Sequence, residues 1–216
     1  MMTSPYLIGN NPMYLGFKLN KGNAKENYKY DTNQLDNIIG LLTQARDTIS
    51  RPCVYEATLI LEPPFVMDEI IQPSNFDVKS LKTVLIADSY SYHWTIEHSK
   101  KDTYHIHIMI IFSRDEFNPF THWRVLQRRL SQLDGVVSAA IKPRHNNLGK
   151  FHDLTDDAEY VDAIKRFTYQ AKMNQKVNLS FKERSFGCSK LDQRYKISRR
   201  DVRIIHEFVE LNTLKF

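Results

Sequence analysis

The sequence has few cysteines and no long apolar run, and each of these absences excludes a class of protein. Cys53 and Cys188 are its two cysteines. They are too few for a disulfide framework and are not spaced as a metal-binding pair. No apolar run approaches the roughly 18–20 residues that a membrane helix requires, and no basic region followed by an apolar stretch marks a secretory signal at the N-terminus. We therefore expect a protein of a reducing, cytoplasmic compartment that makes no membrane contact.

The sequence also lacks internal repeats, low-complexity tracts and a phosphate-binding loop of the GxxxxGK[ST] type, so no nucleotide-driven motor is expected within it. Positive charge is scarce in the first half and concentrated in the second. Residues 1–100 carry 9 basic and 11 acidic side chains, a net charge of −2, whereas residues 101–216 carry 21 and 14, a net charge of +7. A basic C-terminal half favours a polyanionic partner such as nucleic acid.

Hydrophobic periodicity predicts an α+β fold in which helices alternate with strands. Helices are expected over 32–49, near 75–87, over 122–133 with Thr121 as the N-cap, over 156–174 with Thr155 as the N-cap, and over 198–211. Strands are expected over 53–61, 91–98, 103–112 and 136–142. The central pair reads as a hairpin, which predicts an antiparallel sheet. We expect an N-terminal arm and helix over 1–50, a core domain over 51–190, and a C-terminal helix over 191–216 packed on it.

The strand "TYHIHIMIIF" at 103–112 carries two histidines side by side on one face. Tyr104, Ile106, Ile108 and Ile110 alternate with His105, His107, Met109 and Ile111, so one face is fully apolar and the other begins with two imidazoles. In the preceding strand, "SYHWTIEH", the same alternation puts Glu97 on the histidine face. Because opposed residues of an antiparallel pair share a face, Glu97 is expected across from one of the histidines.

Two imidazoles and one carboxylate converging on a point form a set of metal ligands. We therefore predict that His105, His107 and Glu97 bind a divalent cation, Mg²⁺ or Mn²⁺, with open positions for substrate oxygens. Zn²⁺ is less specifically suited. The alternative is a half-solvated sheet on which these histidines are ordinary surface residues. His93 shares the Glu97 face and is a candidate to support or replace a ligand.

The helix expected over 156–174 supplies a candidate nucleophile. At about 100° per residue, Ala158, Val161, Ile164, Thr168 and Ala171 form the expected buried stripe, and Lys165, Tyr169 and Lys172 share a more polar face. A tyrosine flanked by lysines can act as a nucleophile, because nearby positive charge favours the phenolate. Tyr160 falls beside Phe167 on the apolar side, and we interpret it as structural. The alternative for Tyr169 is that it merely caps the packing surface of the helix.

These residues together resemble a known family. "HIH" at 105–107 is similar to the His-hydrophobic-His motif of HUH endonucleases, and "YQAK" at 169–172 is similar to their Tyr-x-x-Lys motif. The pattern W-T-I-E-x(7)-H-I-H, the later "FTYQAK" and "RSFGCS" at 184–189 more narrowly resemble the replication initiators of filamentous-phage type. The resemblance covers roughly residues 53–190. It departs from two-tyrosine relatives, because no second tyrosine follows Tyr169 at i+4.

The resemblance implies an HUH/Rep-type (RRM-like) endonuclease fold, with the tyrosine helix across the metal-bearing face of a central antiparallel sheet. It implies nicking of single-stranded DNA at an origin, or origin hairpin, that leaves a 5′-phosphotyrosine and a free 3′-OH for rolling-circle replication. By this resemblance His105, His107 and Glu97 bind the metal, Tyr169 attacks, and Lys172 supports the phosphate or the metal. A helicase and a polymerase would come from the host.

Further DNA contacts are expected from basic residues. Lys165 lies on the helix with Tyr169. The motif "RSFGCSK" is expected to be a loop near DNA, where Gly187 permits close approach. The terminal helix can grip duplex DNA beside the nick. The side chains expected to contact phosphates are Lys165, Arg184, Lys190, Arg199, Arg200 and Arg203.

Two alternatives stay open from the sequence. A transposase or plasmid relaxase of the HUH class would share this chemistry and differ in biological context. A non-catalytic DNA-binding protein would keep the basic half and the sheet without the reaction. A histidine-triad nucleotide hydrolase fits poorly, because Met109 stands where its third histidine is required.

Overall fold

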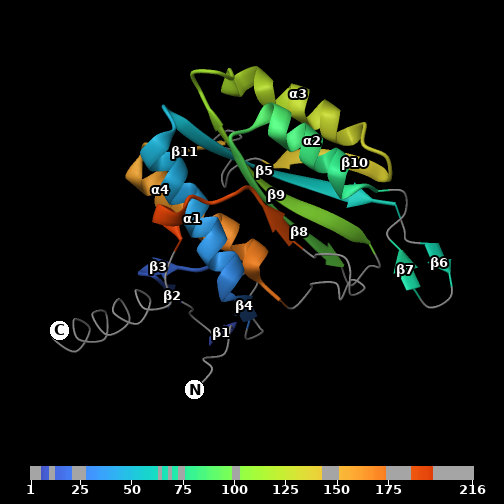
Figure 1. Cartoon of the computed structure of the whole chain (residues 1–216), viewed down its shortest axis with the longest axis horizontal. Helices are drawn as coiled ribbons and strands as arrows, with labels where there is room; N and C mark the ends of the chain where they lie inside the picture. The colour runs from blue at the N-terminus through green and yellow to red at the C-terminus, as the bar shows by residue number, and fades with distance from the viewer. Residues whose placement is uncertain are drawn as a thin grey trace.

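The computed structural model describes residues 6–9, 13–20, 28–62, 65–67, 70–72, 76–98, 103–142, 151–173 and 186–196. These residues form an α+β fold built on one antiparallel sheet with helices on both faces (Figure 1). The expected fold class is therefore confirmed at this level. The sheet has six strands, whereas about five were predicted. The terminal helix predicted over 198–211 lies outside the described residues.

The sheet follows the order β10-β5-β9-β8-β12, with β11 also paired to β5. Every strand pair within it is antiparallel. The strands are β5 (Pro52–Leu61), β8 (Ser91–His98), β9 (Tyr104–Ser113), β10 (Val136–Lys142), β11 (Phe151–Asp153) and β12 (Phe186–Cys188). The four sequence-predicted strands are thus present, and β9, which carries the two histidines, lies in the middle of the sheet. Short two-stranded pairs add β1 (Tyr6–Gly9) with β4 (Tyr28–Asp31), β2 (Met13–Tyr14) with β3 (Phe17–Lys18), and β6 (Phe65–Met67) with β7 (Ile70–Gln72).

Four α-helices are present among the described residues, and they cover the two faces of the sheet in pairs (Figure 1). Helices α2 (Val78–Asp88) and α3 (Pro119–Ser131) pack on one face, and α1 (Thr32–Thr48) and α4 (Asp157–Phe167) pack on the other. Alternation along the strands explains this arrangement, because successive side chains point to opposite faces and each face needs its own cover. No helix among the described residues is long and apolar enough to cross a membrane.

The face under α2 and α3 is apolar throughout its centre. Ile106, Ile108 and Ile110 of β9 are fully buried there. They pack with Trp94 of β8, with alternate residues of β5 and with leucines of both helices. The burial of such side chains stabilises a fold by about 1.5–3 kcal/mol each, so this layer holds the sheet in place without any help from the histidines.

The face under α1 and α4 is divided between apolar and polar residues. Met109 and Ile111 of β9 are buried against leucines and isoleucines of α1 and against Ile164 and Phe167 of α4. Towards the other end of the same strand this face carries His107 and His105 instead. Helix α1, which was predicted over 32–49, is therefore part of the same core as α4.

The predicted N-caps of two helices are wrong by one to three residues. Asn118 caps α3, since its side chain accepts from the backbone N–H of Phe120 and Pro119 takes the first helical position. Asp156 caps α4 by accepting from the N–H of Glu159. Thr155 instead hydrogen-bonds Asp153, which shows that a carboxylate displaced the neighbouring hydroxyl as the cap.

The expected loop "RSFGCSK" contains an edge strand in its described part. Residues 186–188 form β12 against β8, so that Gly187 lies opposite Trp94. A Cβ added at Gly187 would come within 2.7 Å of the Trp94 ring. The glycine therefore permits close packing of β12 over an indole, and this explains its presence without a DNA contact.

Candidate metal and tyrosine site

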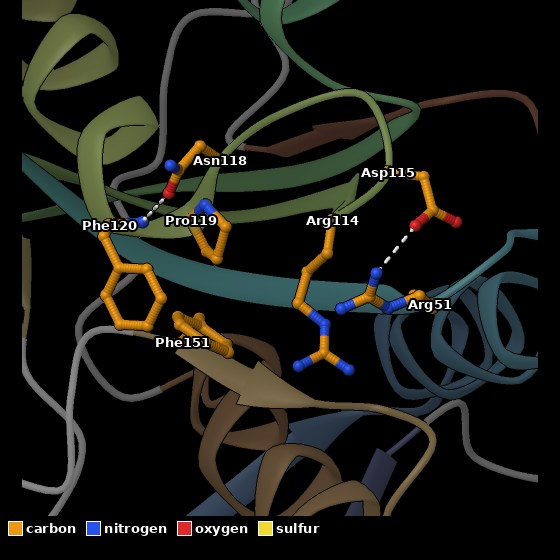
Figure 2. Close-up of a pocket in the computed structure, with 7 residues that line it drawn as sticks. All are labelled: Arg51, Arg114, Asp115, Asn118, Pro119, Phe120 and Phe151. Atoms are coloured by element: carbon orange, nitrogen blue, oxygen red, sulfur yellow. Dashed lines mark hydrogen bonds and ion pairs between the residues drawn. The ribbon is translucent and has the colours of Figure 1, made fainter.

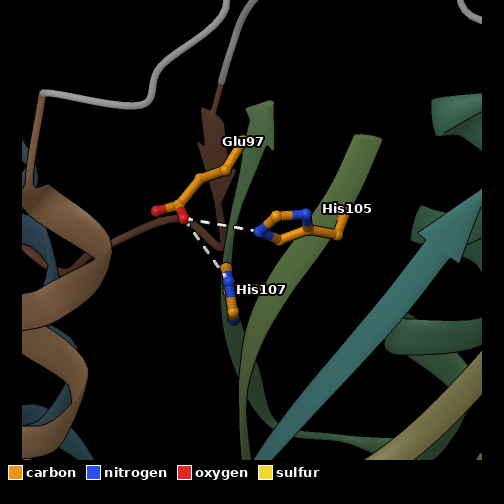
Figure 3. Close-up of side chains that lie close together, drawn as sticks. All are labelled: Glu97, His105 and His107. Carbon is orange, nitrogen blue, oxygen red and sulfur yellow. Dashed lines mark ion pairs between the residues drawn. The ribbon is translucent and has the colours of Figure 1, made fainter. Parts of the chain in front are cut away.

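The sheet register brings the three predicted metal ligands together. Glu97 pairs directly with His105 across β8 and β9, and His107 is one pleat further along, opposite Thr95. The expected placement of Glu97 across from a histidine is confirmed. Since both histidines and Glu97 point to the α1/α4 face, their side chains converge at the end of that face where the apolar core stops (Figure 3).

The ligand atoms lie within metal-binding reach of one another. One oxygen of Glu97, Oε2, is 3.7 Å from Nε2 of His105 and 3.4 Å from Nε2 of His107 (Figure 3). In the described part of the chain, this trio is the one group of three ionisable ligands whose donor atoms all lie within 4.8 Å of each other. The cluster can hold a metal ion, because two imidazoles and a carboxylate present neutral nitrogen and anionic oxygen donors to one point.

The cluster is buried on one side and open on the other. The side chains of Glu97 and His107 are 2% and 8% exposed, whereas that of His105 is 20% exposed. A metal ion held there would be fixed from below by the sheet and reached from the His105 side. This difference favours a site with substrate access over a closed structural metal site.

A set of residues missed by the sequence reasoning lies behind His107. Glu56 and Thr58 of β5 share its face, and Thr58 pairs directly with His107. The Nδ1 atom of His107 is 3.3 Å from the Thr58 hydroxyl and 3.7 Å from Glu56. With its Nε2 towards Glu97 and its Nδ1 towards Thr58 and Glu56, the imidazole is held at both nitrogens, and such contacts orient a metal-binding histidine.

Glu56 is the centre of a partly buried charge network. Its carboxylate accepts a hydrogen bond from Nε of Arg166 at 2.5 Å, and Nζ of Lys142 lies 3.2 Å from it. Burial raises the pKa of Glu56, but the contacts with His107, Lys142 and Arg166 together outweigh burial, so the pKa lies well below its usual range. The carboxyl is therefore ionised at neutral pH. A lone Glu in the apolar stretch "CVYEATLIL" was the sequence signal that could have identified it.

His107 is influenced by two carboxylates at once. Burial lowers its pKa, and the neighbouring carboxylates of Glu56 and Glu97 raise it by more, so the net pKa lies above the ordinary value. Without a metal the imidazole is thus stabilised as a cation between two anions. A cation bound at Nε2 would replace the proton there and pair with Glu97, while Nδ1 would still face Glu56.

Tyr169 lies against the cluster, although not on the helix predicted for it. Helix α4 ends at Phe167 and the chain tightens into a 3₁₀ helix over Thr168–Ala171, which we call the tyrosine turn. The ring of Tyr169 meets the ring of His107 edge-on, with centroids 6.1 Å apart. Nζ of Lys172 lies 5.2 Å from the centre of the tyrosine ring.

The predicted single helix over 156–174, with Lys165, Tyr169 and Lys172 on one face, is wrong. Lys172 adopts an extended conformation after the tyrosine turn and bridges to Tyr30 of β4. This pairing pulls the chain out of α-helical register, so helical spacing no longer relates the three side chains. Lys165 is exposed on α4, while Lys172 is buried at 6% exposure beside Tyr169.

The predicted buried stripe of this helix is also partly wrong. Ala158 and Val161 are exposed, whereas Ala163 and Phe167 are fully buried with the predicted Ile164. Thr168 and Ala171, which were predicted in the stripe, are buried as expected. At the start of the helix the buried residues are Tyr160 and Ala163, two positions after the predicted ones.

Tyr160 is buried as a structural residue, in agreement with its interpretation from the sequence. Its hydroxyl lies 2.8 Å from the hydroxyl of Thr43 on α1, and its ring meets Phe17 edge-on. Burial raises the pKa of Tyr160. The two tyrosines of this segment therefore occupy different environments, one within the α1/α4 core and one against the histidine cluster.

The residues expected to contact DNA are only partly described. Lys165 and Lys190 are exposed. Arg184, Arg199, Arg200 and Arg203 lie outside the described residues. The predicted auxiliary histidine, His93, is fully buried and hydrogen-bonds Gln170 of the tyrosine turn, with Nδ1 2.9 Å from Oε1. Its ring is not among the three clustered ligands.

A concavity lies near the start of β5 (Figure 2). His107 and His105 pair with residues at the other end of that strand. It has a volume of about 390 Å³ and combines two arginines with the rings of Phe120 and Phe151. Each arginine already has a carboxylate partner, since Arg51 pairs with Asp115 at 3.0 Å and Arg114 pairs with Asp153 at 2.6 Å. This neutralisation makes the concavity a weak site for an anion.

The fold and cluster together define an α+β protein with a candidate metal site on the central strands of its sheet. Compared with known families and curated proteins, the chain matches no family model and no curated sequence.

Proposed function

We propose that the protein is a metal-dependent endonuclease of the HUH type, which nicks single-stranded DNA at a replication origin through Tyr169. The observation that carries the proposal is the placement of Tyr169. Its ring lies edge-on against His107 of the Glu97–His105–His107 cluster, and the Lys172 ammonium lies beside it. A nucleophile, a metal site and a cation are thus adjacent on one face of the sheet, although the residues lie far apart in the sequence.

The proposed reaction is a transfer of one phosphodiester bond. The phenol oxygen of Tyr169 attacks phosphorus, its proton is lost, and the bond from phosphorus to the 3′ oxygen breaks. The 3′ oxygen takes up a proton and leaves as a free 3′-OH, while the 5′ phosphate remains bonded to the tyrosine. The number of phosphoester bonds is unchanged, so no external energy source is required.

Each residue of the site has a role in this scheme. Glu97, His105 and His107 would hold Mn²⁺ or Mg²⁺, and the ion when bound withdraws charge from the scissile phosphate. A phenol has an ordinary pKa of about 10, so attack at neutral pH requires help in stabilising the phenolate. Lys172 supplies a buried positive charge close to the Tyr169 ring, which favours the phenolate and the charge that develops on the phosphate.

The direct test is incubation of the protein with Mn²⁺ and a pool of labelled single-stranded oligonucleotides, followed by a denaturing gel. We expect a shortened oligonucleotide with a free 3′-OH and a second labelled band that migrates with the protein and disappears after protease treatment. Both bands should be absent with EDTA. Binding of the pool without any cleavage or adduct would contradict the proposal and favour a non-catalytic DNA-binding protein.

A further inference from the structure

His93 and Gln170 connect the metal-bearing strand to the tyrosine turn. Nδ1 of His93 lies 2.9 Å from Oε1 of Gln170, and both residues are buried, at 0% and 3% exposure. Gln170 is the residue directly after Tyr169. His93 belongs to β8, the strand that also carries the ligand Glu97.

Strand β8 carries both His93, which contacts the tyrosine turn, and the candidate metal ligand Glu97 on the same face. His93 and Glu97 are four residues apart, so they point to the same face and are separated by roughly 13 Å along the strand. Strand β8 is paired on both sides, with β9 and with β12, and this fixes the two positions relative to each other. The strand therefore holds a metal ligand at one point and the neighbour of the tyrosine at another.

A buried imidazole and a buried amide are costly choices for simple packing. Each polar group loses its water, and a hydrogen bond to a matched partner offsets that loss only when the geometry is kept. Apolar residues at the same two positions would bury the turn without this requirement. A polar pair, in contrast, admits one arrangement of the turn on the strand, which is how such groups specify a unique packing.

The turn is also held at its two ends. The hydroxyl of Thr168 accepts a hydrogen bond from the N–H of Asn20 at 3.4 Å, and Lys172 bridges to Tyr30. The partners in these two contacts, Asn20 and Tyr30, belong to the N-terminal segment. The sheet contacts the turn through a different residue. The His93–Gln170 hydrogen bond supplies this contact, next to the tyrosine itself.

From this geometry we infer that His93 and Gln170 are positioning residues, which set the distance between the Tyr169 phenol and the metal cluster. The inference rests on the proposed function for its catalytic consequence. The hydrogen bond acts by orientation, because a nucleophile displaced by about 1 Å loses on the order of 10²-fold in rate. His93 is thus assigned to the tyrosine rather than to the metal.

The test uses Gln170→Met, which keeps the length of the side chain and removes the acceptor, and His93→Asn, whose amide N–H can replace Nδ1–H. Single-turnover nicking with saturating DNA should fall by about 10–100-fold in Gln170→Met, with Mn²⁺ affinity and DNA affinity unchanged. His93→Asn should retain most of the rate. His93→Leu should lose as much as Gln170→Met, and the double variant His93→Leu/Gln170→Met should lose no more than either one.

The matched control is Gln127→Met on α3. Its amide oxygen accepts a hydrogen bond from the backbone N–H of Ile141 at 3.3 Å, on the far side of the sheet from Tyr169. Gln127→Met also removes a glutamine acceptor from a hydrogen bond, and it should leave the nicking rate constant at the wild-type value. Equal losses of rate in both variants, or additive losses in the double variant, would show that Gln170 acts through stability alone and would overturn the inference.

A second readout separates this inference from the proposed function. 3-Fluorotyrosine introduced at position 169 should give one narrow ¹⁹F resonance in the metal-free wild type, and a broadened or split resonance in Gln170→Met, with recovery in His93→Asn. If wild-type protein cleaves no DNA but these resonances behave as stated, the proposed function fails and the positioning role stands. An unchanged resonance in Gln170→Met would overturn the positioning role whatever the protein cleaves.

Discussion

Alternate residues of β9 face two very different environments, and the contrast separates what holds the fold from what the fold carries. On the α2/α3 face, Ile106, Ile108 and Ile110 are fully buried in a continuous apolar layer. On the α1/α4 face, Met109 and Ile111 are packed in the same way, but His107 and His105 replace apolar residues at the end of the strand. Stability therefore depends on both faces, whereas the candidate site is confined to part of one.

The polar part of that face extends across three strands. Glu56 and Thr58 of β5, the two histidines of β9, and His93, Thr95 and Glu97 of β8 all share it. Seven adjacent polar positions in a sheet interior are unfavourable for stability unless each is satisfied. Contacts with Arg166, Lys142 and Gln170 satisfy several of these polar groups. Such a cluster of polar and ionisable side chains is expected at a functional site.

The largest effect should come from His105→Ala. Loss of one imidazole leaves two ligands, so Mn²⁺ affinity should fall and nicking should decrease by on the order of 10³-fold or more, equivalent to about 4 kcal/mol. The free energy of unfolding of the metal-free protein should change by less than about 1 kcal/mol, since His105 lies outside both apolar clusters. Titration with Mn²⁺ and urea unfolding measure the two quantities, and a large loss of stability would mean that His105 is a core residue.

Substitution of the adjacent residue, Ile106, should change stability and leave metal binding unchanged. Ile106→Ala removes a fully buried side chain from the α2/α3 layer, and should lower the free energy of unfolding by about 2–5 kcal/mol. At a temperature where the variant is folded, its Mn²⁺ affinity should equal that of the wild type. If Ile106→Ala also lowered Mn²⁺ affinity, or His105→Ala also lowered the free energy of unfolding by several kcal/mol, the contrast between the two faces would be wrong.

A smaller effect is expected from Glu56→Gln. The folded-state pKa of Glu56 lies below its ordinary value of 4.5, because the contacts with His107, Lys142 and Arg166 outweigh burial. The carboxylate thus contributes stability above pH 4.5, and this contribution is lost as the pH falls through the folded-state pKa. Urea unfolding should show Glu56→Gln less stable than wild type by about 1–3 kcal/mol at pH 7, with the difference shrinking below pH 4.5. A difference that grows on acidification would contradict the assignment.

The sequence alone could predict the parts of the site that obey local rules. Strict alternation over 103–112 predicts which face each histidine occupies, and the hairpin predicts Glu97 across from one of them. The structure shows that this histidine is His105. Period-two patterns depend only on the strand itself and on its neighbour, so they survive folding unchanged. Apolar residues at helical spacing are likewise a local pattern, and they predict the helix over 32–49 that the structure shows as α1.

The tyrosine turn could not be predicted in this way. Helical spacing over 156–174 was extended through Lys172, but pairing of Lys172 with Tyr30, more than 140 residues earlier in the chain, ends the helix at Phe167. The charge network of Glu56 could not be predicted either, because its partners Arg166 and Lys142 come from two other elements. In both cases a long-range contact decided the outcome, and such contacts leave no periodic signal in the local sequence.

The central claim is that Tyr169, beside the metal cluster, is the nucleophile. The most direct measurement is mass spectrometry of the protein–oligonucleotide adduct formed with Mn²⁺ and trapped by denaturation. We predict that the phosphonucleotide maps to the peptide containing Tyr169, that Tyr169→Phe forms no adduct while retaining Mn²⁺ and DNA binding, and that Tyr160→Phe forms the adduct normally. A phosphonucleotide on Tyr160, or on a residue other than tyrosine, would contradict the claim.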